Sequence, residues 1–165
     1  MGKVLDTAER LAWAKGTKKK KYAYKGGKPT KAFRVALKKV FPKRKWSPAA
    51  RKGASCDVAV AVCARYSGVA KKYPRGRDKQ RVYKPKKMTR IAKKNARPID
   101  YAKKGDIILY DRTKGGKKGH TFIYGGDRLY EAANKKTYFH TVAKPENVSK
   151  KMNKKYKKII ILREK

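Results

Sequence analysis

The pattern of apolar and polar positions divides the chain into a helical first part and a last part made of strands. Two early segments, residues 4–15 and 33–41, carry apolar side chains at helical spacing, and Gly16 and Pro42 follow them as helix breakers. After residue 105, β-branched and aromatic runs alternate with clusters of Gly, Asn, Lys or Pro. The expected strands are residues 106–110, 121–125, 128–132, 137–142 and 158–162. Helices followed by antiparallel strands predict an α+β fold.

The segment between these two parts is polar. Residues 71–100 contain three prolines and many Lys and Arg side chains, so we expect a long loop or short helices there rather than a core element. At 165 residues the chain has the length of one ordinary domain. We therefore expect a single domain over 1–165 in four parts: a helical part with a Lys-rich loop (1–50), a buried helix (51–70), a basic loop region (71–104) and an antiparallel sheet (105–165).

The least polar stretch is GASCDVAVAVCARYSG, residues 53–68. Its alternating Val and Ala would fit a strand by period alone, but Ala is also apolar, so the segment is apolar on all sides. The flanking residues favour a helix. Ser55 suits an N-cap, Asp57 suits the positive end of the helix dipole, and Gly68 suits a C-terminal stop. We predict a buried helix over 56–67.

The same stretch contains both cysteines of the chain. On a helix, Cys56 and Cys63 lie about 10.5 Å apart along the axis, at about 1.5 Å per residue. Because a disulfide needs Cα atoms within about 7 Å, we expect no bond between them. Cys63, in mid-helix, is interpreted as a small core residue. Cys56 falls in the first turn, where free N–H groups and the dipole favour a thiolate and can hold an oxyanion.

A possible base for this thiol lies on the expected hairpin. A two-residue turn at 125–126 would pair residues whose numbers sum to 251, so that His120 faces Glu131 and Phe122 faces Leu129. Cross-strand partners have Cβ atoms about 4.5–5.5 Å apart, which lets a carboxylate hydrogen-bond an imidazole. The carboxylate would fix one ring nitrogen of the histidine and leave the other to accept a thiol proton.

Simpler interpretations of the two histidines stay open at this point. The pair of His120 and Glu131 could be an ordinary surface pair on a hairpin. The second histidine, His140, has no such partner by register, and we interpret it as structural. Two scattered His and two Cys at seven-residue spacing fit no common zinc pattern, so we expect no metal site. The sequence indicates no cofactor.

Charge is the most unusual property of the chain. Fifty Lys and Arg against eleven Asp and Glu give a formal charge of +39, spread over the whole length. Such a charge attracts any polyanion, whether nucleic acid, anionic lipid or a phosphate-bearing wall polymer. With 39% hydrophobic residues the chain can still form a core. No apolar run approaches a membrane span, and the first residues lack a secretion-signal pattern.

Four stretches match, in the same order, motifs of one enzyme family. YAYKGG (22–27) resembles a Y-x-W-G-G motif, and SCDVAVAVCARYSGV (55–69) resembles a helix that begins D-C-S-G-L-V. KKGDIILY (103–110) resembles a P-G-D-L strand, and GHTFIYGGDRLYEAA (119–133) resembles a strand that opens G-H-x-G-I-Y and continues into a hairpin. By these motifs the chain resembles the NlpC-type cell-wall cysteine peptidases, relatives of the CHAP amidases with a papain-like core.

This resemblance implies a papain-like α+β domain in which N-terminal helices, including the nucleophile helix, precede an antiparallel sheet. It implies Cys56 as nucleophile, His120 as general base and Glu131 as third member; Glu occurs there in CHAP-like enzymes, and His, Asn or Gln in most NlpC relatives. The resemblance further implies substrate contacts by a set of residues near the nucleophile. These are Tyr22 and Tyr24 as a wall of the site, and Ser55 and Asp57, which stand where relatives have Asp and Ser.

The resemblance also implies a substrate and a location. The expected reaction is hydrolysis of amide bonds in peptidoglycan stem peptides or cross-bridges, by a monomer acting outside the cell or in the wall. Anionic wall polymers such as teichoic acids would then be partners of the basic surface, and nucleic acid would bind only as a non-specific polyanion. Two alternatives remain: a non-enzymatic nucleic-acid or polyanion-binding protein, and an acyltransferase on the same scaffold.

Overall fold

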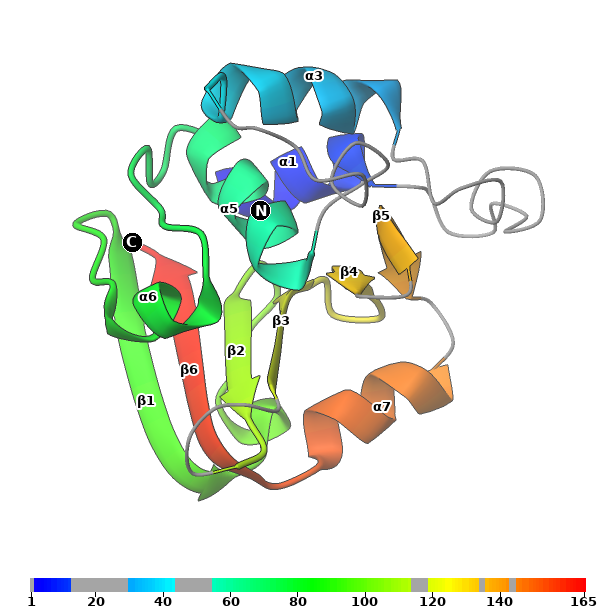
Figure 1. The fold of residues 1–165 in the computed structure, drawn as a ribbon. Helices are drawn as coiled ribbons and strands as arrows, with labels where there is room; N and C mark the ends of the chain where they lie inside the picture. The colour runs from blue at the N-terminus through cyan, green and yellow to red at the C-terminus, as the bar shows by residue number, and fades with distance from the viewer. Residues whose placement is uncertain (1, 13–29, 44–54, 114–118, 134–135, 143–144) are drawn as a thin grey trace.

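The computed structural model describes residues 2–12, 30–43, 55–113, 119–133, 136–142 and 145–165, and Figure 1 shows their arrangement. The helices are α1 (Lys3–Leu11), α3 (Lys31–Val40), α5 (Cys56–Tyr66), α6 (Arg77–Val82), the short 3₁₀ helix η1 (Pro98–Asp100) and α7 (Pro145–Asn153). The strands are β1 (Met88–Ala96), β2 (Ile107–Asp111), β3 (Gly119–Tyr124), β4 (Leu129–Ala133), β5 (Lys136–Val142) and β6 (Tyr156–Glu164).

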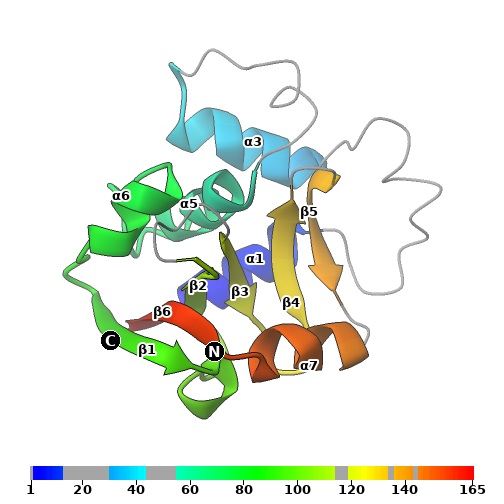
Figure 2. The same cartoon turned by 60° about the horizontal axis from the view of Figure 1, so that its bottom comes forward.

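The strands form one antiparallel sheet in the order β1-β6-β2-β3-β4-β5. Helices α1, α3 and α5 pack on one face of the sheet, and α7 packs on the other (Figures 1 and 2). Successive residues of β2 alternate between the two layers: Ile107 and Leu109 contact the helical core, whereas Ile108 and Tyr110 contact the α7 side. The α+β class expected from the sequence is confirmed.

Helix α5 is the centre of the larger core. All seven residues from Val58 to Ala64 are buried, as expected for a helix that is apolar on every side. Its three valines each contribute about 1.5–3 kcal/mol by burial. The helix ends at Tyr66, and Gly68 adopts a positive φ of 80° just beyond it, a conformation that glycine tolerates best. The predicted buried helix is confirmed, with its start at Cys56.

The polar region 71–100 differs from the expectation of a loop or short helices. It contains α6, but it also contains β1, a nine-residue strand that pairs with β6 from Met88↔Glu164 to Ala96↔Tyr156. The strand is hard to recognise because it lies at the edge of the sheet and most of its side chains are exposed. Lysines on an edge strand, such as Lys93 and Lys94, also discourage pairing with another chain.

The β3–β4 hairpin is present, but its predicted register is wrong by two residues. The observed pairs are Ile123↔Tyr130 and Tyr124↔Leu129, whose numbers sum to 253. The physical reason is the turn: the Gly125 N–H donates to the carbonyl of Arg128 at 2.8 Å, which moves the turn from 125–126 to 126–127.

The change of turn by one residue alters which residues pair, but each side chain stays on the expected face of the sheet. Gly126 supplies the positive φ that a tight turn needs, at 87°. Continued along the strands, this register makes His120 and Glu131 diagonal neighbours instead of direct partners. Because strand side chains alternate with period two, an even shift leaves both on the same face of the sheet. Phe122 and Leu129, the second expected pair, likewise share a cluster on the α7 side without facing each other.

Candidate active site

His120 lies near the start of β3, among aromatic rings. Its ring centroid is 6.0 Å from that of Tyr110 and 5.9 Å from that of Phe122. Only 13% of its side chain is exposed. Gly119, the residue before it, approaches β2 so closely that a Cβ would overlap the Tyr110 carbonyl oxygen. Close strand pairing and the surrounding rings therefore hold the imidazole in place.

Glu131 contacts this imidazole directly. The distance from His120 Nε2 to Glu131 Oε2 is 2.5 Å, and the glutamate side chain is 6% exposed. Diagonal neighbours on a sheet lie within reach of long side chains, so the contact forms despite the changed register. A carboxylate can only accept, so Nε2 carries the proton and donates it. The pair predicted from the sequence is thus brought together, and Nδ1 is left for another partner.

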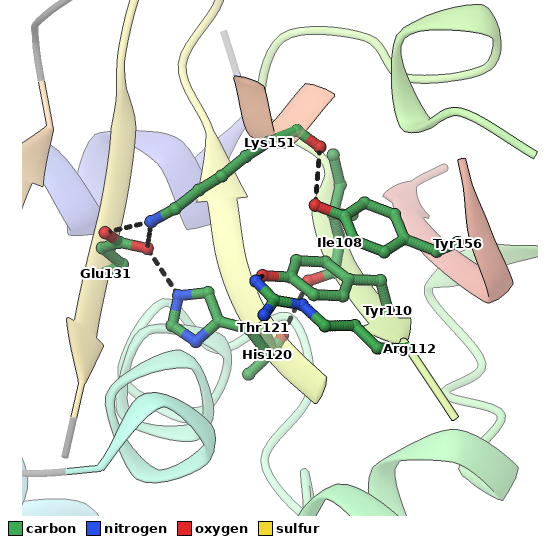
Figure 3. A network of polar contacts seen from close by, with 8 residues as sticks. All are labelled: Ile108, Tyr110, Arg112, His120, Thr121, Glu131, Lys151 and Tyr156. Carbon is green, nitrogen blue, oxygen red and sulfur yellow. Dashed lines mark hydrogen bonds and ion pairs between the residues drawn. The ribbon is translucent and has the colours of Figure 1, made fainter. Parts of the chain in front are cut away.

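A third residue, which the sequence analysis did not identify, completes this network. Lys151 Nζ, from α7, donates to both carboxylate oxygens of Glu131 at 2.5 and 2.6 Å (Figure 3). The signal that could have revealed its helix is weak but present: Pro145 begins the segment, and Val148 and Met152 are spaced i, i+4. Nothing in the sequence distinguishes this lysine from its many neighbours.

The charges of the network shift the pKa values of both buried partners. Burial alone would raise the pKa of Glu131, but hydrogen bonds and charges from His120 and Lys151 outweigh burial and lower it to about 2. Burial would lower the pKa of His120, but hydrogen bonds to Cys56 and Glu131 and their negative charges raise it above its ordinary 6.5. The network therefore keeps Glu131 a carboxylate and stabilises the imidazolium that forms when His120 takes up a proton.

Cys56 is the second partner of His120. It is the first residue of α5 and half-buried, and α5 packs against β3 and β4. A hydrogen bond to its thiol and the charge of its sulfur are among the causes that raise the pKa of His120. The structure therefore brings together the three residues Cys56, His120 and Glu131 that the sequence predicted as a catalytic set.

Ser55 and Asp57 flank the thiol at the start of α5. Ser55 occupies the N-cap position but makes no capping bond; its hydroxyl donates to Asp57 Oδ1 at 2.5 Å. The other oxygen of Asp57 accepts the Gly76 N–H at 2.8 Å, and its carbonyl accepts from the buried amide of Gln80 at 2.9 Å. Asp57 thus attaches the α6 segment beside the nucleophile, a role in addition to the substrate contact expected of it.

The other cysteine has a different environment. Cys63 is fully buried in the core, and burial raises the pKa of its thiol. Both cysteines are free, which confirms that they do not pair. Burial makes Cys63 an inert packing residue, whereas half-buried Cys56 is accessible for chemistry.

Some predicted residues lie outside the part that the structure describes. Tyr22 and Tyr24, the expected wall of the site, are outside the described residues. The backbone of His140 pairs with that of Glu131 in the β4–β5 ladder, but its side chain is outside the described part. Among the described residues, no group of three or more His, Cys, Asp or Glu could hold a metal ion.

Two further findings concern the surface. A pocket of about 300 Å³ lies between the two ends of the chain and contains none of the residues of the site. Its lining is mostly cationic: Lys3, Lys86, Lys87 and Lys165 surround Glu164, together with Gly68 and Val69. No helix within the described ranges has the length and apolar character needed to cross a membrane.

Comparisons with known proteins add no relative. No protein-family model matches the chain, and neither the curated proteins nor the solved structures contain a match.

Proposed function

We propose that the protein is a papain-like cysteine peptidase or amidase of the NlpC or CHAP type. The observation that carries this proposal is the pairing of His120 with two partners at once. One ring nitrogen donates to Glu131, and the thiol of Cys56 is the second partner. A nucleophile, a base and a group that orients the base are what a covalent acyl-transfer mechanism requires.

The proposed reaction begins with transfer of the Cys56 proton to His120. The thiolate attacks an amide carbonyl and forms a C–S bond; when the tetrahedral intermediate collapses, the C–N bond breaks and the imidazolium protonates the leaving amine. His120 then takes a proton from water, and the hydroxide attacks the thioester carbonyl. When this second intermediate collapses, the C–S bond breaks, a carboxylic acid is released, and the imidazolium returns its proton to the Cys56 sulfur. Glu131 keeps Nε2 protonated throughout and stabilises the imidazolium.

In this proposal, the start of α5 stabilises the oxyanion that forms during the reaction. Because Ser55 makes no capping bond, its side chain does not occupy the N–H groups of the first helical turn. Such N–H groups and the positive end of the helix dipole can stabilise an oxyanion beside Cys56. The helix therefore serves two roles in the proposal, since it positions the nucleophile and it supplies the oxyanion site.

The proposed substrates are stem peptides or cross-bridges of peptidoglycan, and the proposed place of action is the cell wall. This part rests on the sequence motifs and on the charge of +39, which suits a protein that stays bound to teichoic acids or other anionic wall polymers. Hydrolysis is proposed over acyl transfer, and the products of the reaction distinguish them: a transferase would attach the acyl group to an acceptor amine or lipid.

The test is mass spectrometry of purified peptidoglycan after incubation with the wild type, Cys56→Ser and Cys63→Ala. We expect new peptide ends with the wild type and Cys63→Ala, and release below about one thousandth of the wild-type rate with Cys56→Ser. Cys63→Ala is the matched control because it removes a thiol from the same helix at a fully buried position. Absence of products from every variant, over walls of several chemical types, would leave the polyanion-binding alternative.

A further inference from the structure

We propose that Lys151 is a positioning residue of this site: by sharing the charge of Glu131, it determines how readily His120 gives up its proton. The inference rests on the proposed function for its catalytic meaning, but its physical content is a property of the network alone. It concerns a residue that acts on His120 through its contacts with Glu131.

The contact geometry carries the first step. Glu131 Oε2 accepts from His120 at 2.5 Å and from Lys151 at 2.6 Å, while Oε1 accepts from Lys151 at 2.5 Å. One nearly buried carboxylate therefore faces two cations. The side chain of Lys151 is 26% exposed, so its ammonium is held between solvent and the network. Charges this close interact strongly because little water separates them.

The backbone of Lys151 is fixed to the same structure. Its carbonyl accepts from the Tyr156 hydroxyl at 3.1 Å, and the Tyr156 ring stacks on Tyr110 with centroids 3.8 Å apart. Tyr110 in turn packs edge-on against His120 (Figure 3). Met152, the next residue along α7, is fully buried in the core beneath the sheet. These contacts fix the position from which the Lys151 side chain extends toward Glu131, whereas an ordinary surface lysine has no such support.

The surrounding charged groups make the direction of the effect clear. Among the described side chains, the groups that face His120 and Glu131 include the Cys56 thiol from α5, Lys151 from α7 and the Tyr110 hydroxyl from β2, which Arg112 Nη2 approaches at 3.5 Å. Lys151 is a second cation on the carboxylate: it bonds Oε1 and also Oε2, the oxygen that accepts from His120. Without it, the whole charge of Glu131 would act on His120, and the imidazolium would hold its proton more tightly.

The experiment is an NMR titration of the His120 ring proton in wild type, Lys151→Met, Lys151→Arg and Lys150→Met, with His140→Gln to assign the two histidine signals. We expect Lys151→Met to raise the His120 pKa by about one pH unit, and Lys151→Arg to keep it near the wild-type value. Lys150→Met is the matched control: it removes the same charge from an exposed neighbour on α7, where solvent screens it.

A purely structural role for Lys151 would give a different result. Lys151→Met would then be less stable but would titrate like Lys150→Met, and that outcome overturns the inference. If the methionine variant does not fold, as judged by circular dichroism, Lys151→Gln keeps a donor without the charge and carries the same expectation.

Hydrolysis of peptidoglycan is measured separately. A shifted His120 pKa in a protein that cuts no wall would support the network and reject the enzyme. Hydrolysis combined with an unshifted pKa in the charge-removing variants would reject the role of Lys151 alone.

Discussion

At the scale of residues, Glu131 is the group on which the site depends. It is 95% buried, yet it is ionised because His120 and Lys151 stabilise its charge from two sides. Burial by itself opposes ionisation of a carboxylate, so each partner has to compensate for lost water. The same contacts that make the site chemically useful therefore also make stability depend on pH.

Glu131→Gln should flatten this dependence on both sides. The folded-state pKa of Glu131 is lowered from 4.5 to about 2, so its contribution is complete above pH 4.5 and is lost as the pH falls toward 2. The raised pKa of His120 contributes below pH 6.5 and is lost as the pH rises through the folded-state value. At about 1.4 kcal/mol per pH unit, the acid side amounts to on the order of 3 kcal/mol.

The measurement is denaturant unfolding of wild type and Glu131→Gln between pH 2 and 9, compared as differences so that other carboxylates cancel. We expect the difference in unfolding free energy to shrink at both ends of this range. Parallel curves for the two proteins would contradict the charge assignment of the network.

At the scale of elements, apolar alternation and end signals predict where most helices and strands lie in the sequence. They do not predict which residues pair across the sheet. Helix α5 was predictable because its flanks and its apolar length agree, and five strands were predictable from their β-branched runs. Strand β1 was not, because an edge strand with exposed Lys and Arg shows no apolar alternation. The contact of Lys151 with Glu131 was not predictable either, because it depends on how α7 packs on the sheet.

The hairpin shows why the site was found even though its register was wrong. Either glycine of the pair at 125–126 could begin the turn, and local sequence does not decide between them. The choice changes which residues face each other, but His120 and Glu131 stay on one face in both cases. The long side chains of His120 and Glu131 then reach each other across the diagonal. The predicted contact between them therefore survived an error in the predicted register.

Gly119→Ala tests how far the site depends on the start of β3. A Cβ at this position would overlap the Tyr110 carbonyl and lie 2.7 Å from Arg77 Nη1, so β3 must move away from β2 and carry His120 with it. We expect the unfolding free energy to fall by about 1–3 kcal/mol. We expect the rate of wall hydrolysis to fall about 100-fold, because a displacement of His120 by about 1 Å is enough to cause such a loss.

Gly126→Ala, in the turn that follows the other end of β3, is the matched control. It strains a positive φ of 87° at a cost of about 1–2 kcal/mol, but its Cβ meets only Lys104 at ordinary contact distance. Hydrolysis should therefore be nearly unchanged. Equal loss of activity in both variants would mean that general destabilisation, and not the position of His120, explains the effect.

At the scale of the whole molecule, three of the eleven acidic residues are buried, and each is bonded to a basic partner. Asp106 is buried and bound by Arg163, Asp111 is buried and bound by Arg81, and Glu131 serves the candidate site. Outside these buried pairs, the remaining basic residues outnumber the acids by far, over nearly every segment of the chain. A charge of +39 therefore acts mostly outward, as a field that attracts polyanions over a large area.

Retention on cell walls should therefore depend on salt and on the anionic polymer, and not on the nucleophile. Between about 0.1 M and 1 M salt the screening length falls from about 10 Å to about 3 Å, so the field reaches little beyond contact at high salt. We expect Cys56→Ser, which leaves the wall intact, to bind teichoic-acid-bearing walls at low salt and to leave them at high salt. Walls stripped of teichoic acid should retain much less of it. Retention that is equal at both salt concentrations would show that short-range contacts, and not the charge of the surface, hold the protein to its substrate.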